Sequence, residues 1–180
     1  MTKPAPNWKT KANQIRLIRE ACREGEAKLG AQVAIATSAD QRATVLAGIY
    51  VAAATGVVAG LLATSRGGIV LIVAAASAAA AFLIGALLCL KAPLPVIFWM
   101  PGNDPSQWYQ DIEESKPEHE ALGEQLVHYD KHIKENEKTL QGNASYFSWG
   151  AKLGIAAPII GALVGLLVWC LPALCSCFPT

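Results

Sequence analysis

Two histidines on one face of a predicted helix are the residues best suited to chemistry in this sequence. His128 and His132 stand four positions apart, with Glu124 and Glu135 close by, and imidazole and carboxylate groups at this spacing could hold a metal ion. A histidine pair without a third strong ligand is common by chance, so we expect no metal. The sequence contains no catalytic constellation and no phosphate-cradling loop, so we expect neither an enzyme nor a cofactor.

The cysteines do not form a metal or disulfide framework. None has paired CxxC spacing or a nearby ligand histidine, which such frameworks need. The five are Cys22, Cys89, Cys170, Cys175 and Cys177. We expect those in or near apolar segments to behave as small apolar residues.

A stripe of basic residues near the N-terminus is the second candidate for chemistry. Lys9, Arg16 and Arg23 recur every seven residues, and Arg19 lies beside them on a helix surface. A solvated face that follows the positive-inside rule explains this stripe. Alternatively, copies of the helix in an oligomer join their stripes into a ring or groove for an anionic ligand.

Three long stretches without a charged side chain must position these groups. They cover residues 44–64, 69–90 and 153–174, and the first two are joined by the tight connector 65–68. A helix of about 21 residues rises roughly 30 Å, the thickness of the hydrocarbon core of a bilayer. The sequence therefore predicts an all-α membrane protein with three transmembrane helices. Because the spans lack ionisable groups at depth, a proton-coupled pump is disfavoured.

The spans and their polar flanks divide the chain into five parts. We expect a basic amphipathic cytoplasmic helix, a two-helix transmembrane hairpin, a cytoplasmic helical segment, a third transmembrane helix and a tail, over residues 1–43, 44–90, 91–149, 150–174 and 175–180.

Charge and aromatic residues predict the orientation in the membrane. Residues 1–43 carry eight Lys/Arg against four Asp/Glu, whereas residues 91–150 carry five against ten. The basic flank predicts a cytoplasmic N-terminus, and two crossings return the chain to the cytoplasm. Trp99, Trp149 and Trp169 fall near predicted span ends, where tryptophan anchors helices at the interface.

Small residues follow one edge of each hairpin helix. On the first helix a small residue occurs every four positions, at Gly48, Ala52, Gly56 and Gly60. The second helix has the same spacing at Ser77, Ala81 and Gly85. Such edges let helix backbones approach closely in lipid, so we interpret them as packing seams. The alternative is a weakly polar pore lining that includes Thr55 and Ser77 and closes by dewetting.

Two polar helices are predicted outside the bilayer. Residues 8–42 form a long helix with an apolar stripe that packs on a partner, and helix starts are predicted at Asp104 and Ser115. A heptad seam with one polar member follows, formed by Leu122, Leu126, Tyr129, Ile133, Asn136 and Leu140. A polar residue in such a seam fixes register or oligomer state. The heptad spacing of this seam continues through Gly154 and Gly161, which predicts one long helix running into the third span.

The order of these elements resembles that of small bacterial anti-phage membrane effectors, the SLATT proteins and the transmembrane effectors of Pycsar systems. The run 38–43 at the first span, and Tyr129-Asp130 with Ile133 and Asn136, carry the resemblance. The third span and the lack of a separate nucleotide-binding domain depart from the simplest members. The plan also resembles the effector of Hailong defence, an oligomeric channel that the family's description says is held shut by single-stranded DNA.

The resemblance implies a bacterial inner-membrane protein that assembles with itself. It further implies single-stranded DNA or another nucleotide as ligand and a nucleotidyltransferase as partner. Under this hypothesis the basic stripe contacts phosphate and an aromatic residue stacks on a base, the residues being Lys9, Arg16, Arg19, Arg23 and Trp8.

Three functions are compatible with the sequence. The one we favour is a homo-oligomeric, ligand-gated pore, with a tetramer as the expected assembly, which depolarises the host membrane during anti-phage defence. The second is a non-conducting membrane scaffold whose cytoplasmic helices recruit a soluble partner. The third is a holin-like lysis protein.

Overall fold

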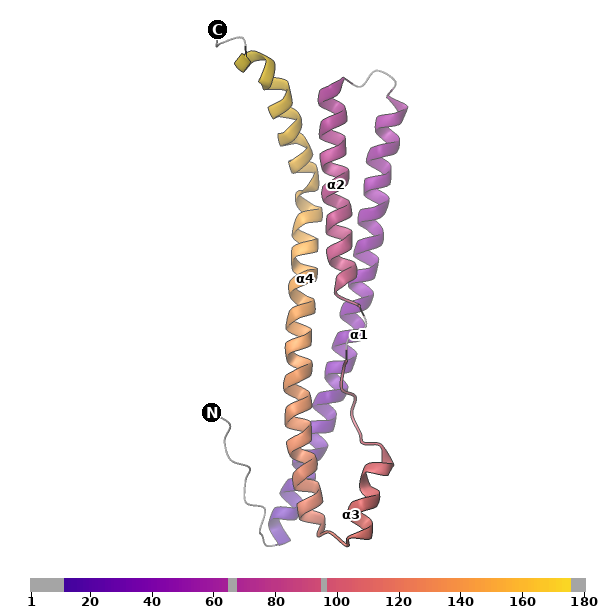
Figure 1. The fold of residues 1–180 in the computed structure, drawn as a ribbon, viewed down its shortest axis with the longest axis vertical. Helices are drawn as coiled ribbons and strands as arrows, with labels where there is room; N and C mark the ends of the chain where they lie inside the picture. Colours follow the sequence, from indigo (N-terminus) through magenta and orange to yellow (C-terminus); the bar gives the residue numbers. More distant parts are fainter. Residues whose placement is uncertain (1–11, 65–67, 95–96, 176–180) are drawn as a thin grey trace. The chain divides into compact units, whose positions relative to one another are not determined.

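A computed structural model describes residues 12–64, 68–94 and 97–175, and all regular structure in these ranges is helical (Figure 1). Helix α1 covers Ala12–Ala63, α2 covers Ile69–Lys91 and α4 covers Glu118–Cys175. Between α2 and α4 lie the 3₁₀-helix η1, Pro105–Trp108, and the short helix α3, Tyr109–Glu113. The predictions of an all-helical fold and of one long helix entering the third apolar stretch are confirmed.

Proline and capping residues set several helix ends. Helix α2 ends at Lys91, before Pro93, because proline cannot continue a helix. The side chain of Asp104 accepts a hydrogen bond from the backbone N–H of Ser106 at 3.1 Å and caps η1. Helix α4 begins at Glu118, three residues after the predicted start at Ser115, which has a φ of 52° and lies in the turn after α3.

The chain forms two compact units, and α1 and α4 contribute to both. Unit 1 comprises Met1–Ser38 and Val96–Gln141, and unit 2 comprises Ala39–Pro95 and Gly142–Thr180. The boundaries after Ser38 and Gln141 therefore lie inside the long helices α1 and α4 rather than in linkers. In α1, the five residues 39–43 separate the boundary from the predicted apolar stretch 44–64.

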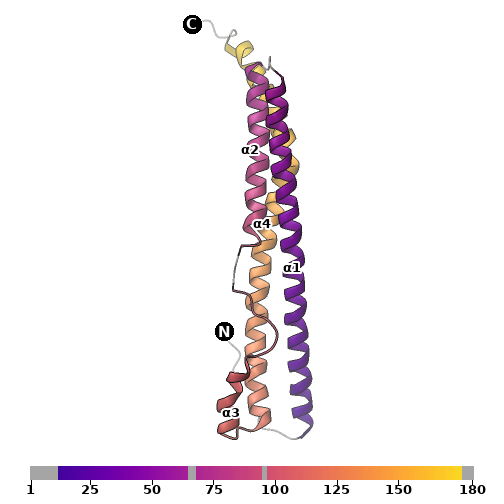
Figure 2. The ribbon, with the colours of Figure 1, turned by 90° about the vertical axis from the view of Figure 1, so that its right-hand side faces the viewer.

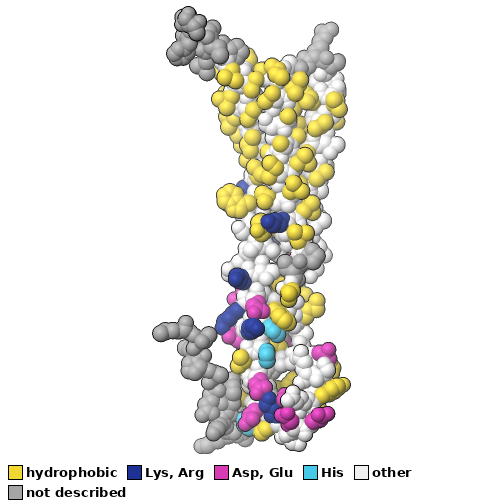
Figure 3. All heavy atoms as spheres, in the orientation of Figure 1, with side chains coloured by type: hydrophobic (Ala, Val, Ile, Leu, Met, Phe, Trp, Pro, Cys, Tyr) yellow, Lys and Arg dark blue, Asp and Glu magenta, His cyan; other side chains and the backbone are white. Residues whose placement is uncertain are grey.

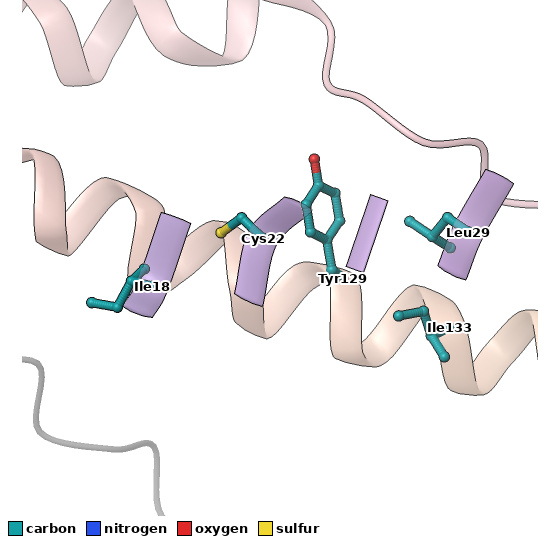
Figure 4. Close-up of a cluster of buried hydrophobic side chains, with 5 residues drawn as sticks. All are labelled: Ile18, Cys22, Leu29, Tyr129 and Ile133. Carbon is teal, nitrogen blue, oxygen red and sulfur yellow. The ribbon is translucent and has the colours of Figure 1, made fainter. Parts of the chain in front are cut away.

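In unit 1, α1 and α4 run parallel and bury an apolar core between them. Figure 4 shows Ile18, Cys22 and Leu29 of α1 facing Tyr129 and Ile133 of α4. Leu29 is completely buried and Tyr129 is 3% exposed. The apolar stripe predicted on the first helix therefore packs on a partner as expected, and the partner is α4 of the same chain.

A non-helical segment of unit 1 is fixed to α4 by carboxamide side chains. Asn136 is fully buried, accepts a hydrogen bond from the backbone N–H of Trp99 and donates one to its carbonyl, both at 2.9 Å. The side chains of Gln125 and Asn103 donate one hydrogen bond to each other's carboxamide oxygen. Because unpaired buried amides are costly, these pairs specify where residues 97–104 lie on the helix.

In unit 2, α1 and α4 run parallel to each other and antiparallel to α2 (Figures 1 and 2). Ala47 and Tyr50 of α1 pack with Ala86 and Cys89 of α2 in one buried cluster. The Tyr50 hydroxyl donates a hydrogen bond to the carbonyl of Ala151 at 3.0 Å, which ties α1 to α4.

Close backbone approach between α2 and α4 depends on glycine in unit 2. A methyl group at Gly150 would lie 2.8 Å from the carbonyl oxygen of Gly85, and one at Gly161 would lie 2.8 Å from that of Ala74. The Tyr50 ring also occupies the space where a side chain at Gly154 would begin. These contacts are the small-residue packing that association in lipid requires.

Three helices, within α1, α2 and α4, are long and apolar enough to cross a membrane. Large apolar side chains remain exposed along them, including Leu62 at 77% and Leu87 and Leu167 at 67% and 66%. Figure 3 shows an almost continuous apolar surface over this part of the chain. A water-soluble protein rarely exposes so large an apolar area, so the membrane prediction is supported.

Candidate functional site: the open face of α1

The small-residue edge of α1 is open in the single chain. Its predicted members Gly48, Ala52, Thr55, Gly56 and Gly60 are all exposed. A methyl group added at any of the three glycines would meet nothing within 4 Å. This edge therefore has no intramolecular packing role, and contact between copies or a pore lining stays a prediction.

Helix α1 packs within the chain through its opposite face instead. Ala43, Ala47, Tyr50 and Ala54 are buried, at 1%, 2%, 5% and 3% exposure. Alternating steps of four and three residues place them on one face of the helix. Sequence reasoning missed this face because the glycine repeat on the opposite face is the stronger signal.

The hydroxyl groups predicted for a pore lining are bonded within their own helices. Thr55 donates to the carbonyl of Val51 at 2.9 Å, and the half-buried Ser77 donates to that of Val73 at 2.6 Å. Such bonds reduce the cost of placing hydroxyls in lipid. Thr55 lies on the open α1 edge, whereas Ser77 lies on α2 beside the buried Ala78.

The best-packed small-residue seam of unit 2 is on α4, and only Gly154 and Gly161 of it were singled out from the sequence. Its buried members are Gly150, Gly154, Ala157, Gly161 and Gly165. Facing it on α2, Ala81 and Gly85 are buried as the predicted second edge requires. The spacing of the α4 seam, with steps of four, three, four and four residues, is visible in the sequence and could have revealed it.

The basic stripe is largely paired with carboxylates where the structure describes it. Arg19 donates to Glu118 at 2.8 Å and 2.5 Å, and Arg23 forms an ion pair with Glu20. The hydrogen bonds that Arg23 donates to Glu20 lower the pKa of Glu20 and raise the pKa of Arg23. Arg16 is exposed, while Trp8 and Lys9 lie outside the described residues.

The ion pairs of Arg19 and Arg23 compete with the predicted contact between the basic stripe and DNA phosphate. A phosphate group would have to replace Glu118 at Arg19 and Glu20 at Arg23. Over residues 14–38 and 97–141 the chain carries eight Lys/Arg and thirteen Asp/Glu, and an acidic surface repels polyanions. Contact between the stripe and DNA stays a prediction that rests on the resemblance alone.

The heptad seam of α4 packs against other segments of the same chain. Tyr129, Ile133 and Asn136 are buried, and the remaining members Leu122, Leu126 and Leu140 are half-buried. The Tyr129 hydroxyl donates to Glu26 at 2.6 Å, and burial with this bond raises the pKa of Tyr129 to about 12. The seam therefore joins α4 to α1 and to the segment at Trp99, and its predicted role between copies gains no support from this packing.

A polar cavity of about 730 Å³ lies beside the two histidines in unit 1. The rings of Trp99 and His132 stack at a centroid distance of 4.0 Å, and the Trp99 indole donates to Glu135 at 2.6 Å. These contacts attach Trp99 to α4 in unit 1, and its role as a span-end anchor stays a prediction. No group of three metal-ligating side chains is present among the described residues.

No protein family, curated protein or solved structure that was compared matches this chain. The resemblance to anti-phage effectors therefore stays a prediction from short motifs. The functional argument has to rest on the geometry of the chain itself, and the open α1 face is the feature without a structural explanation inside one copy.

Proposed function

We propose that the chain is a subunit of a homo-oligomeric membrane pore, in which the open α1 faces of several copies meet around a central axis. The supporting observation is that a methyl group added at Gly48, Gly56 or Gly60 would meet nothing within 4 Å outside the local helix backbone. Glycines on α4 in the same unit are, by contrast, packed against α2. In lipid, apolar burial does not drive helices together, and small-residue faces associate by close packing.

The polar groups of this face suit the axis of an assembly better than the lipid. Gly48, Gly56 and Gly60 expose backbone and Thr55 exposes a hydroxyl, whereas the bulky residues Val51, Val58 and Leu62 are exposed on another face of the same helix. Val45 and Ile49 are the exposed apolar residues at the polar end of the glycine face. A narrow, weakly polar lumen of this kind closes by dewetting and opens by widening. A tetramer is the assembly that we favour.

Gating follows in this proposal from the continuity of α1. The helix runs without a break from Ala12 to Ala63, so it belongs to the polar unit at one end and to the open face at the other. A ligand that changes the packing of α1 in unit 1 would shift the population of open pores. We infer a cytoplasmic location for unit 1 and depolarisation of a bacterial inner membrane as the cellular effect.

The test is electrical recording from the purified full-length protein in planar bilayers, with and without single-stranded oligonucleotides. Gly56→Leu places a bulky side chain on the open face, and we expect about a ten-fold weaker self-association, the equivalent of roughly 1.4 kcal/mol, together with loss of conductance. Val58→Leu, on another exposed face, is the matched control and should behave like the native protein.

Three results would separate the alternatives. Native protein that assembles but never conducts, under any ligand condition, removes the pore and favours the scaffold. Timed lysis on co-expression with an endolysin favours the holin-like function. Gly56→Leu protein that assembles and conducts normally shows that the open α1 face has no part in the pore.

A further inference from the structure

A groove at the polar end of the apolar helices in unit 2 has the form of a lipid site. It has a volume of about 370 Å³ and is lined by Gln41, Arg42, Val45, Leu46, Ile49 and Phe147. Five of these residues lie on one face of α1 over two turns, and Phe147 comes from α4. The volume falls at the low end of the roughly 300–1,000 Å³ typical of small-molecule sites.

The base of the groove is anchored in the core of unit 2. Leu46 and Phe147 pack against the buried cluster of Ala47, Tyr50, Ala86 and Cys89. Val45 and Ile49 are 64% and 55% exposed and form the open side. The groove is therefore held by packed helices rather than by a loop, so its shape does not depend on the occupant.

The polarity of the groove changes along its length. Gln41 and Arg42 form one end, and the sequence after Arg42 carries no charged residue until Arg66. From Gln41 to Ile49 the helix rises roughly 12 Å. An amphiphile with an anionic head and an apolar chain matches this order, because the head meets the cation and the chain follows the apolar part.

The charge of unit 2 at this end favours an anion. Among its described residues the cations are Arg42, Lys91 and Lys152, and Asp40 is the one carboxylate. The Lys91 ammonium lies 4.5 Å from the ring centre of Tyr146, which precedes the groove residue Phe147. The Lys152 ammonium lies 5.2 Å from the ring centre of Trp149. Basic and aromatic residues together are typical of the membrane interface.

We infer that this groove binds a phospholipid of net negative charge, with its phosphate at Arg42 and one acyl chain along Val45, Ile49 and Phe147. Guanidinium can engage two phosphate oxygens at once, and the excess of cations distinguishes an anionic lipid from a zwitterionic one. Val45 and Ile49 share the α1 face of Gly56, so the bound lipid would lie where neighbouring copies meet in the proposed assembly. Retention of the lipid does not require that the assembled protein conducts ions.

Native mass spectrometry of the full-length protein, released from vesicles of equal parts phosphatidylglycerol and phosphatidylcholine, tests the site. We expect the native protein to retain phosphatidylglycerol preferentially. Arg42→Gln should reduce that preference by about five-fold, the effect of roughly one cation at a membrane surface. Ile49→Trp should reduce retention of both lipids by filling the groove, whereas Ile159→Trp, on the exposed part of α4, should not.

A variant that adds a charge tests the site even if the Arg42→Gln variant misfolds. Gln41→Arg adds a second cation at the polar end and should increase the preference for phosphatidylglycerol, while Arg23→Gln, in unit 1, should leave it unchanged. Equal retention of the two lipids by the native protein would overturn the inference. An unaltered preference in both Arg42→Gln and Gln41→Arg would overturn it as well.

Discussion

Gly25 and Gly30 of α1 both lower the intrinsic helix propensity of their segment, by about 1 kcal/mol each relative to alanine, yet their surroundings differ. A methyl group at Gly25 would lie 3.0 Å from Cδ2 and 3.3 Å from Cβ of Tyr129. At Gly30 the nearest atom, Cγ of Pro101, is 4.0 Å away. Only Gly25 is therefore required by packing, since it lets the buried Tyr129 lie against the α1 backbone.

Alanine at these two positions should have opposite effects. Gly25→Ala overpacks the contact with Tyr129, and we expect a loss of about 1–2 kcal/mol in the free energy of opening of unit 1. Gly30→Ala should be neutral or stabilise by up to about 1 kcal/mol. Amide hydrogen exchange over residues 14–38 measures both, and equal effects of the two variants would contradict the packing argument.

His132 should make unit 1 sensitive to acid. Burial, and then the neighbouring His128, lower the pKa of His132 from its usual 6.5. The unfolded chain therefore binds the proton more readily than the folded chain. Stability from this group is complete above about pH 6.5 and is lost as the pH falls from there to the lowered value.

His132→Phe keeps an aromatic ring against Trp99 but cannot titrate. We expect thermal unfolding of this variant to depend less on pH between about 7.5 and 5 than that of the native protein. His119→Gln, at another half-buried histidine of unit 1, is the control. If His132→Phe loses as much stability on acidification as the native protein does, the contribution of His132 is refuted.

At the scale of the elements, glycine has two different roles in unit 2. On α4, Gly150 and Gly161 sit against α2 backbone, and on α1, Gly48 and Gly56 face open space. Substitutions at the two sets should therefore affect different properties. The α4 glycines should determine the stability of one copy, and the α1 glycines should determine association between copies.

Gly161→Leu tests this distinction. The new side chain would meet the carbonyl oxygen of Ala74 and Cβ of Ala78, each 2.8 Å from its first carbon. We expect a destabilisation of about 2–3 kcal/mol in detergent, measured as a lowered unfolding midpoint by circular dichroism. Gly56→Leu should leave that midpoint within about 0.5 kcal/mol of native. Equal destabilisation by both variants would contradict the assignment.

At the scale of the whole molecule, the cations of unit 2 predict its orientation. Arg42, Lys91 and Lys152 all stand where an uncharged stretch meets a polar one, and Arg66 alone lies in the connector between the first two stretches. The positive-inside rule then places residues 1–43 and 91–150 in the cytoplasm.

Labelling of introduced cysteines with a membrane-impermeant reagent would test this topology. Thiols at Ser106 and Thr37, introduced into a cysteine-free protein, should be protected in intact cells, and one at Gly67 should react. If the thiol at only one of positions 106 and 37 reacted, these positions would lie on opposite sides of the membrane. That result would contradict the predicted order of three spans.

The sequence by itself determined the helical class, the three apolar helices and the continuity of α4, because length, absence of charge and heptad spacing act locally along the chain. It also indicated the proline and Asp104 boundaries. Local pattern could not show which of two opposite faces of α1 is buried, since both carry small residues at helical spacing. Only the tertiary structure decided that Ala43, Ala47, Tyr50 and Ala54 pack inward, that the seam of α4 meets α1, and that Arg19 is paired with Glu118. The contacts between α1 and α4 join residues about 100 positions apart in the chain.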